Sequence, residues 1–167
     1  LGEEALAAAS LGVSIYGVVA WSLSALSGSS AALIAAELGR RNHAVREVRR
    51  TVRMAMWIAL LCAGIGMALC YAGQGLMAAT GQEPHVSARA AGYLALLLWA
   101  MPFFLAANVL RTFVSALGRP IYATAITALG VALNCLGNYA LVYGHFGLPA
   151  LGLRGSAIAT VLASAAT

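Results

Sequence analysis

Charged residues are scarce in this sequence. They make up 9% of its 167 residues, whereas 62% are hydrophobic, and the mean hydropathy is +0.87. A soluble domain of this size would have too few polar side chains to cover its surface. The composition therefore predicts an integral membrane protein, because long apolar segments of this kind are typical of membrane spans.

Clusters of catalytic or metal-binding residues are also missing from the sequence. The three cysteines, Cys62, Cys70 and Cys135, lie in apolar runs, without a C-x-x-C motif or a Cys/His spacing. We expect them to be small core residues, and neither a disulfide set nor a metal site. No predicted span combines His, Asp, Glu or Cys in the way that a nucleophile and its base require. An enzyme is therefore disfavoured, and no cofactor is expected.

Basic residues are concentrated in one segment, residues 40–53, which reads RRNHAVREVRRTVR. This segment holds six of the ten arginines and lies between two long apolar runs, so it predicts a short loop between two spans. Short loops rich in arginine stay on the cytoplasmic side during insertion, which sets the orientation of the chain. The net charge of +5 would also suit nucleic acid. No interleaved aromatic residues or RNA-binding motif support that partner, and a cytoplasmic membrane face explains the arginines better.

Five apolar stretches predict a single all-α transmembrane domain over residues 1–167. The expected spans are residues 5–38, 51–80, 86–117, 121–143 and 155–167. The first exceeds the roughly 30 Å hydrocarbon layer and must tilt, overhang the membrane or loosen near Gly28. Pro102 should kink the third span, because it removes a backbone hydrogen bond. The sequence begins without Met and ends inside an apolar run, so we expect it to be a piece of a longer polypeptide.

Small and polar residues form a stripe along the first span. At 100° per residue, one narrow face carries Ser10, Ser14, Gly17, Trp21, Ser24 and Gly28. The simpler interpretation is a seam for close packing against a neighbouring helix. The alternative is that part of the stripe faces a substrate cavity, with Trp21 as an aromatic wall.

The fourth span carries the most informative polar face. One side holds Thr124, Thr127, Gly130, Asn134, Gly137 and Asn138. Such a face in hydrocarbon must be directed at protein or water. Asn134 and Asn138 are four residues apart, so their amides project together. They form either a hydrogen-bonded clamp between helices or a neutral oxygen site for a cation or a polar substrate.

Arg111 is the intramembrane charge of the third span. It lies about two turns from the inner end, so its guanidinium can snorkel to the cytoplasmic interface or pair within the bundle. An intramembrane charge is a candidate functional residue by default, and interfacial anchoring is the alternative.

Two linked segments carry a family resemblance. They are LRTFVSALGRP at residues 110–120 and GLPALGLRGSAIAT at residues 147–160, with Leu133-Asn134 and Asn138-Tyr139 between them. Together they resemble the multidrug and toxic compound extrusion (MATE) family, most of all its bacterial NorM-type members. The resemblance extends over essentially the whole sequence, from the second helix of the family into the sixth.

The resemblance implies a fold and a function. A MATE transporter has twelve helices in two six-helix lobes, and this chain would form most of the N-terminal lobe. By alternating access the family exports organic, often cationic, drugs or toxic compounds in exchange for Na⁺ or H⁺. Its partners would be the lipid bilayer, small organic cations and the C-terminal lobe of the same polypeptide. We expect a multi-pass protein of the bacterial inner membrane, with residues 40–53 in the cytoplasm and no nucleic-acid partner.

The resemblance also implies site residues. Asn134, Asn138 and Thr160 match positions that help to line the cation site of the N-terminal lobe, so Na⁺ is the metal ion that they would bind. Archaeal-type members have Asp at the position of Asn138, and an amide cannot take up a proton. Where the family commonly has Gln, this chain has Glu37.

The alternatives within and outside transport are a flippase and a structural subunit. A flippase for lipid-linked oligosaccharide, from the same broad superfamily, would be expected to have more basic residues in its cavity than Arg111. A purely structural membrane subunit would leave the polar face around Asn134 without a use beyond helix contacts.

Overall fold

The computed structural model describes residues 3–28, 32, 36, 45–79, 84–144 and 150–167. Within these ranges the chain is helical and contains no β-strand. The helices are α1 (Glu3–Gly28), α3 (Val45–Ala79), α4 (Pro84–Leu97), α5 (Ala100–Ala116), α6 (Pro120–Tyr143) and α7 (Leu153–Ala166). The predicted all-α class is therefore confirmed.

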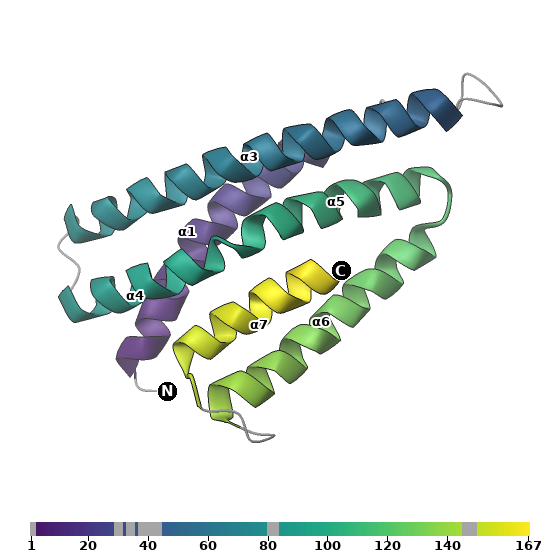
Figure 1. Ribbon diagram of the computed structural model, residues 1–167. Helices are drawn as coiled ribbons and strands as arrows, with labels where there is room; N and C mark the ends of the chain where they lie inside the picture. The colour runs from purple at the N-terminus through teal and green to yellow at the C-terminus, as the bar shows by residue number, and fades with distance from the viewer. Residues whose placement is uncertain (1–2, 29–31, 33–35, 37–44, 80–83, 145–149) are drawn as a thin grey trace.

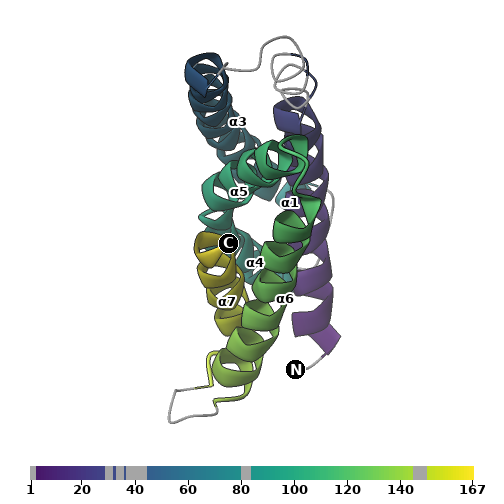
Figure 2. The same ribbon diagram turned by 90° about the vertical axis from the view of Figure 1, so that its right-hand side faces the viewer.

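The helices form a bundle in which neighbours in space are not always neighbours in sequence. In Figure 1, α3 runs alongside the continuous path of α4 and α5, and α1 crosses behind both. Helices α6 and α7 form an antiparallel pair, and α7 also packs against α4 and α5. Figure 2 shows α6 on the outside of this arrangement. The short helix α7 is thus wedged among three others.

The long apolar helices are suited to a membrane. By length and composition, α1, α3 and α6 can each cross a bilayer, and α4 and α5 together can form one bent span. Helix α7 is apolar but shorter. The first expected span continued to residue 38, but α1 ends at Gly28, and most of residues 29–38 lie outside the described part of the chain.

The arginine-rich segment is not a loop over its whole length. Helix α3 begins at Val45, so Arg46, Arg49, Arg50 and Arg53 lie in its first turns and not in a connection. The expected loop over residues 40–53 is wrong from residue 45 onward, and residues 40–44 are outside the described part. Arginine is a good helix former, and these side chains are exposed, so the helix extends past its apolar section.

A bend separates α4 from α5. The two helices meet at 42° across Leu98 and Trp99. Pro102 has no N–H to donate to the carbonyl oxygen of Leu98, which instead accepts from the Met101 amide at 3.0 Å. The Trp99 amide likewise bonds to Leu96 O at 3.2 Å, three residues back. The predicted kink is therefore confirmed, and it falls just before the proline.

The core lies between α1, α3, α4 and α5. Alanines such as Ala59 and Ala63 on α3 are nearly inaccessible and pack against larger side chains such as Leu94, Met101 and Leu105. Small residues on one helix let its neighbour approach closely, which is how membrane helices gain van der Waals contact.

Helix α6 differs, because none of its residues is fully buried within the described chain.

The three cysteines differ in exposure. Cys70 is fully buried, as predicted, and Cys62 is half-buried. Cys135 is exposed on α6, so its assignment to the core was wrong.

Candidate functional site

A pocket of about 220 Å³ lies between α5, α6 and α7. We call it the α6 pocket. Its lining residues are Phe104, Ala107 and Arg111 from α5; Thr127, Gly130, Val131 and Asn134 from α6; and Thr160, Ala163, Ser164 and Thr167 from α7. The polar face predicted for the fourth span therefore borders a cavity in part, and its walls combine apolar surface with hydroxyl, amide and guanidinium groups.

A chain of hydrogen bonds links α6 to α7 at this pocket. The Asn138 side-chain amide donates to Asn134 Oδ1 at 2.9 Å, and the Asn134 amide donates to Thr160 Oγ1 at 3.2 Å. The Thr160 hydroxyl donates in turn to the carbonyl oxygen of Ser156 at 3.0 Å. The structure thus brings together Asn134, Asn138 and Thr160, the three residues that the family resemblance had singled out.

One atom of this network has no donor. The side-chain oxygen of Asn138, Oδ1, is buried and accepts no hydrogen bond from the part of the chain that the structure describes. Asn138 itself does not line the α6 pocket, whereas Asn134 and Thr160 do. Burying an amide oxygen without a partner costs free energy, so such an atom calls for an explanation.

Glycines set the distance between α6 and α7. A methyl group on Gly155 would lie 2.5 Å from the carbonyl oxygen of Leu141, and one on Gly137 would lie 2.9 Å from the Ala159 Cβ. These contacts are too close for any other residue, so part of the polar face of α6 serves packing. The close approach also places Asn134 within hydrogen-bond distance of Thr160.

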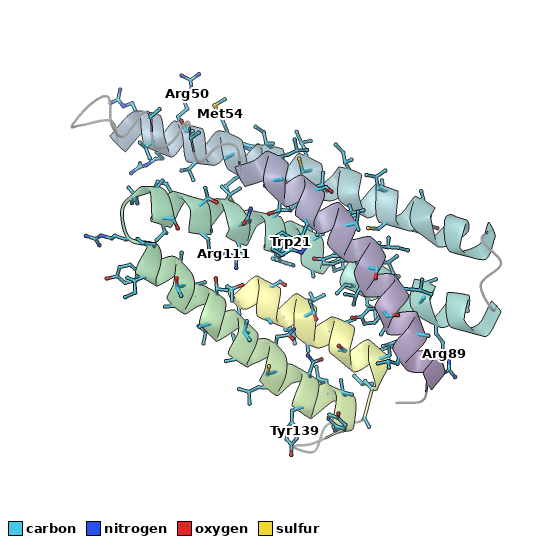
Figure 3. The ribbon with its side chains drawn as sticks, turned by 180° about the vertical axis from the view of Figure 1, so that it is seen from behind. Trp21, Arg50, Met54, Arg89, Arg111 and Tyr139 are labelled. Atoms are coloured by element: carbon cyan, nitrogen blue, oxygen red, sulfur yellow. The ribbon has the colours of Figure 1, made fainter. Side chains whose placement is uncertain are left out.

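Arg111 is directed toward α6. Its Nη1 donates to Thr127 Oγ1 at 3.3 Å, and its Nε donates to the carbonyl oxygen of Ala107 on its own helix at 3.3 Å. Figure 3 shows the Arg111 side chain on the side of α5 that faces α6 and α7. Arg111 therefore has a hydrogen-bond partner within the bundle, which was one of the two predicted arrangements. The guanidinium brings a positive charge to one end of the α6 pocket.

Trp21 stands next to the pocket but does not line it. Its ring meets Phe104 edge-on, with the centroids 6.3 Å apart, and Phe104 is part of the pocket wall. The indole is 71% exposed in the described chain. Trp21 thus offers an aromatic surface near the pocket (Figure 3). It contacts a wall residue, Phe104, and does not itself form the wall of the cavity as the alternative interpretation predicted.

The polar stripe of α1 contacts α5 through Ser24. Ser24 is buried, and its Oγ accepts a hydrogen bond of 2.8 Å from the Asn108 amide on α5. Ser10 and Ser14 are exposed and donate to carbonyl oxygens of their own helix. The polar stripe predicted Ser24 but not its partner, because the contact joins residues 84 positions apart.

The oxygen atoms at the pocket are neutral. Among the residues that the structure describes, no group of three His, Cys, Asp or Glu side chains could hold a metal ion. Asn134, Asn138 and Thr160 supply amide and hydroxyl oxygens, the type of ligand that hard cations prefer. Such a set suits a weakly bound ion, because it offers no formal negative charge.

The helices and the pocket define the class as a polytopic membrane bundle with a cavity of mixed polar and apolar lining between its helices. Comparison with known proteins gives the family. Residues 1–140 match the model of the MatE family. The chain belongs to this family, as the resemblance predicted.

Curated relatives carry the same assignment. The chain is 40% identical over 164 residues to the probable multidrug resistance protein NorM of Mesorhizobium japonicum, and 36% identical over 167 residues to that of Bradyrhizobium diazoefficiens. These matches cover 98% and 100% of the chain but 35% of each relative. The chain thus spans about a third of the length of these relatives. No solved structure matches it significantly.

Proposed function

We propose that the protein containing this chain is a secondary active antiporter, which exports organic, often cationic, drugs or toxic compounds by alternating access. The chain supplies most of the N-terminal lobe, and a C-terminal lobe of the same polypeptide completes the transporter in the bacterial inner membrane. The names of its relatives refer to multidrug resistance, which supports a drug-like substrate.

The coupling site is placed at Asn134, Asn138 and Thr160. The observation that carries this proposal is the buried, unpartnered Oδ1 of Asn138 beside the α6 pocket. A bound cation would give this oxygen the partner that the polypeptide does not. Thr160 Oγ1 and Asn134 Oδ1 lie in the same hydrogen-bonded chain and supply further oxygen ligands.

Na⁺ suits this site better than H⁺ does. Amide and hydroxyl groups do not take up a proton near neutral pH, so exchange of a proton would require an acid elsewhere in the protein. A neutral carbonyl oxygen can still bind Na⁺ through its dipole. We therefore propose that Na⁺ is the ion that occupies this part of the transporter.

The substrate needs more room than the α6 pocket provides. Pockets for drug-sized molecules measure about 300–1,000 Å³, and this one measures about 220 Å³. The exposed Trp21 and the unburied outer face of α6 extend the available surface beyond the pocket. We propose that the organic substrate binds across this larger surface, with Trp21 as an aromatic contact for its cationic group.

No specific observation favours the flippase alternative. Arg111 is the one basic residue that lines the α6 pocket, and it is hydrogen-bonded to Thr127. Recognition of a pyrophosphate-linked oligosaccharide would call for several positive charges in one cavity.

Export of a fluorescent cationic dye tests the site assignment. In the full-length protein, Asn134→Leu and Asn138→Leu should each reduce cation-driven export about tenfold, which corresponds to a lost interaction of about 1.4 kcal/mol. Protein level and membrane insertion should stay unchanged, because leucine is well tolerated in a membrane helix.

Cys135→Leu is the matched control, since Cys135 is exposed on the same helix and contributes nothing to the pocket. Unchanged export in both asparagine variants would remove the site. Loss of export from every variant, Cys135→Leu included, would show that α6 tolerates no change and would equally withdraw the assignment.

A further inference from the structure

A second cavity lies between α3 and α5 and shares no lining residue with the α6 pocket. It has a volume of about 240 Å³ and is lined by Arg53, Met56, Trp57 and Leu60 from α3 and by Pro102 and Ala106 from α5. We call it the α3–α5 groove. One cation stands at one end of an otherwise apolar wall, and this combination is unlike any feature used for transport above.

The groove continues a stripe of arginines on the same helix. At 100° per residue, Arg46, Arg49 and Arg50 lie on the face of α3 that also carries Arg53, within an arc of about 100°. All four guanidinium groups are exposed. Figure 3 shows Arg50 projecting away from the rest of the bundle. This face of α3 therefore changes from four positive charges to an apolar surface within a few turns.

The arginine-rich end of this face matches the anionic headgroup of a phospholipid, and the apolar end matches its acyl chains. From Arg53 to Leu60 the helix rises about 10 Å, which fits within one leaflet of a hydrocarbon layer roughly 30 Å thick. Trp57 and Leu60 are exposed, with 64% and 53% of their surfaces accessible, so they lie outside the core of the described chain. Pro102 and Ala106 present no long side chain, which leaves space for an acyl chain along α5.

We propose that the α3–α5 groove binds one anionic phospholipid of the cytoplasmic leaflet. The phosphate lies against Arg53 and the arginines of the preceding turns, and an acyl chain lies against Met56, Trp57 and Leu60. Charge complementarity selects the occupant: each arginine near the membrane surface attracts acidic lipids, and four on one face distinguish these from zwitterionic lipids. The positive-inside rule assigns this end of α3 to the cytoplasmic leaflet. The site is independent of the proposed cation site.

Lipid binding to the purified full-length protein tests the proposal. Native mass spectrometry in detergent should show retention of one phosphatidylglycerol, with phosphatidylcholine of the same acyl chains bound much more weakly. Glycerol phosphate, which has the headgroup charge without the chains, should not bind measurably. Arg53→Gln should weaken the phosphatidylglycerol complex about fivefold.

Two further variants separate a built site from a general effect of positive charge. Arg119→Gln removes the same charge from an exposed position outside the groove and should leave lipid binding unchanged. Ala106→Leu fills the groove without changing the charge and should weaken binding.

Equal loss in Arg53→Gln and Arg119→Gln, or equal retention of phosphatidylcholine and phosphatidylglycerol, would overturn the proposal. So would tight binding of glycerol phosphate, because the apolar groove would then play no part. If Ala106→Leu does not fold, the comparison of the two arginine variants still decides the question.

Discussion

Individual polar residues in this bundle have partners on other helices, and these partners explain why they are tolerated in an apolar environment. Asn108 donates to Ser24 across α1 and α5, Arg111 donates to Thr127 across α5 and α6, and Asn134 donates to Thr160 across α6 and α7. Hydrogen bonds between membrane helices contribute about 0.6 kcal/mol on average and about 1.7 kcal/mol at most. Each pair therefore fixes the position of its helices more than it stabilises the fold.

The pair Ser24 and Asn108 provides a test at this scale. In a double-mutant cycle with Ser24→Ala and Asn108→Ala, the coupling free energy of unfolding should be about 0.6–1.7 kcal/mol. Ser22→Ala is the control, because Ser22 is exposed and its hydroxyl donates to the Val18 carbonyl oxygen of its own helix. Additive effects of the two substitutions would contradict the importance of this contact.

Pairs of helices are positioned by small residues and by one proline. Gly137 on α6 and Gly155 on α7 let these helices approach until backbone meets side chain. The bend before Pro102 redirects α5, so that Phe104, Ala107 and Arg111 reach the α6 pocket. The geometry of the pocket therefore follows from the packing of α5, α6 and α7 and not from α6 alone.

Substitution of Gly155 tests this claim. Gly155→Ala would place a methyl group 2.5 Å from the Leu141 carbonyl oxygen, and such overpacking costs typically about 1–3 kcal/mol. We expect a lower unfolding temperature in detergent, together with reduced export, because the Asn134–Thr160 contact is displaced. Gly64→Ala on α3 meets nothing within 4 Å and should be neutral or slightly stabilising. Equal effects of the two substitutions would show that the approach of α6 to α7 is not critical.

Sequence analysis could predict what depends on local patterns. Long apolar runs predicted four of the five expected spans, with α4 and α5 counted as one bent span, whereas α7 is shorter. Pro102 predicted the kink, and the four-residue spacing predicted the contact between Asn134 and Asn138. The second span was expected to begin at residue 51, whereas α3 begins at Val45. The prediction was wrong because an arginine-rich segment next to a span is typical of a loop, but arginine also favours helix.

Contacts between distant helices could not be predicted in the same way. The pairing of Asn134 with Thr160 depends on the register of α6 against α7, and that of Ser24 with Asn108 on how α1 crosses α5. Neither register is fixed by periodicity within one helix. A signal was available for the α3–α5 groove, since Arg46, Arg49, Arg50, Arg53, Met56, Trp57 and Leu60 share one helical face.

At the scale of the whole molecule, the chain has one well-packed side and one open side. Helices α1, α3, α4 and α5 share the core, whereas α6 has no fully buried residue, and Trp21 is exposed. This asymmetry fits a lobe whose open side borders a substrate passage shared with the C-terminal lobe of the proposed antiporter. The α6 pocket, lined in part by Asn134 and Thr160, would then lie next to that passage, where an ion can enter and leave.

Ion-dependent stability of the full-length protein tests the central claim most directly. Ligands that bind the folded state alone raise its stability in proportion to the logarithm of their concentration above Kd. The unfolding temperature should therefore rise with NaCl more than with equal concentrations of choline chloride, and Asn138→Leu should abolish this difference whereas Cys135→Leu keeps it. An Na⁺-dependent rise that persists in Asn138→Leu would contradict the account, because the buried Oδ1 of Asn138 would then have no part in binding the ion.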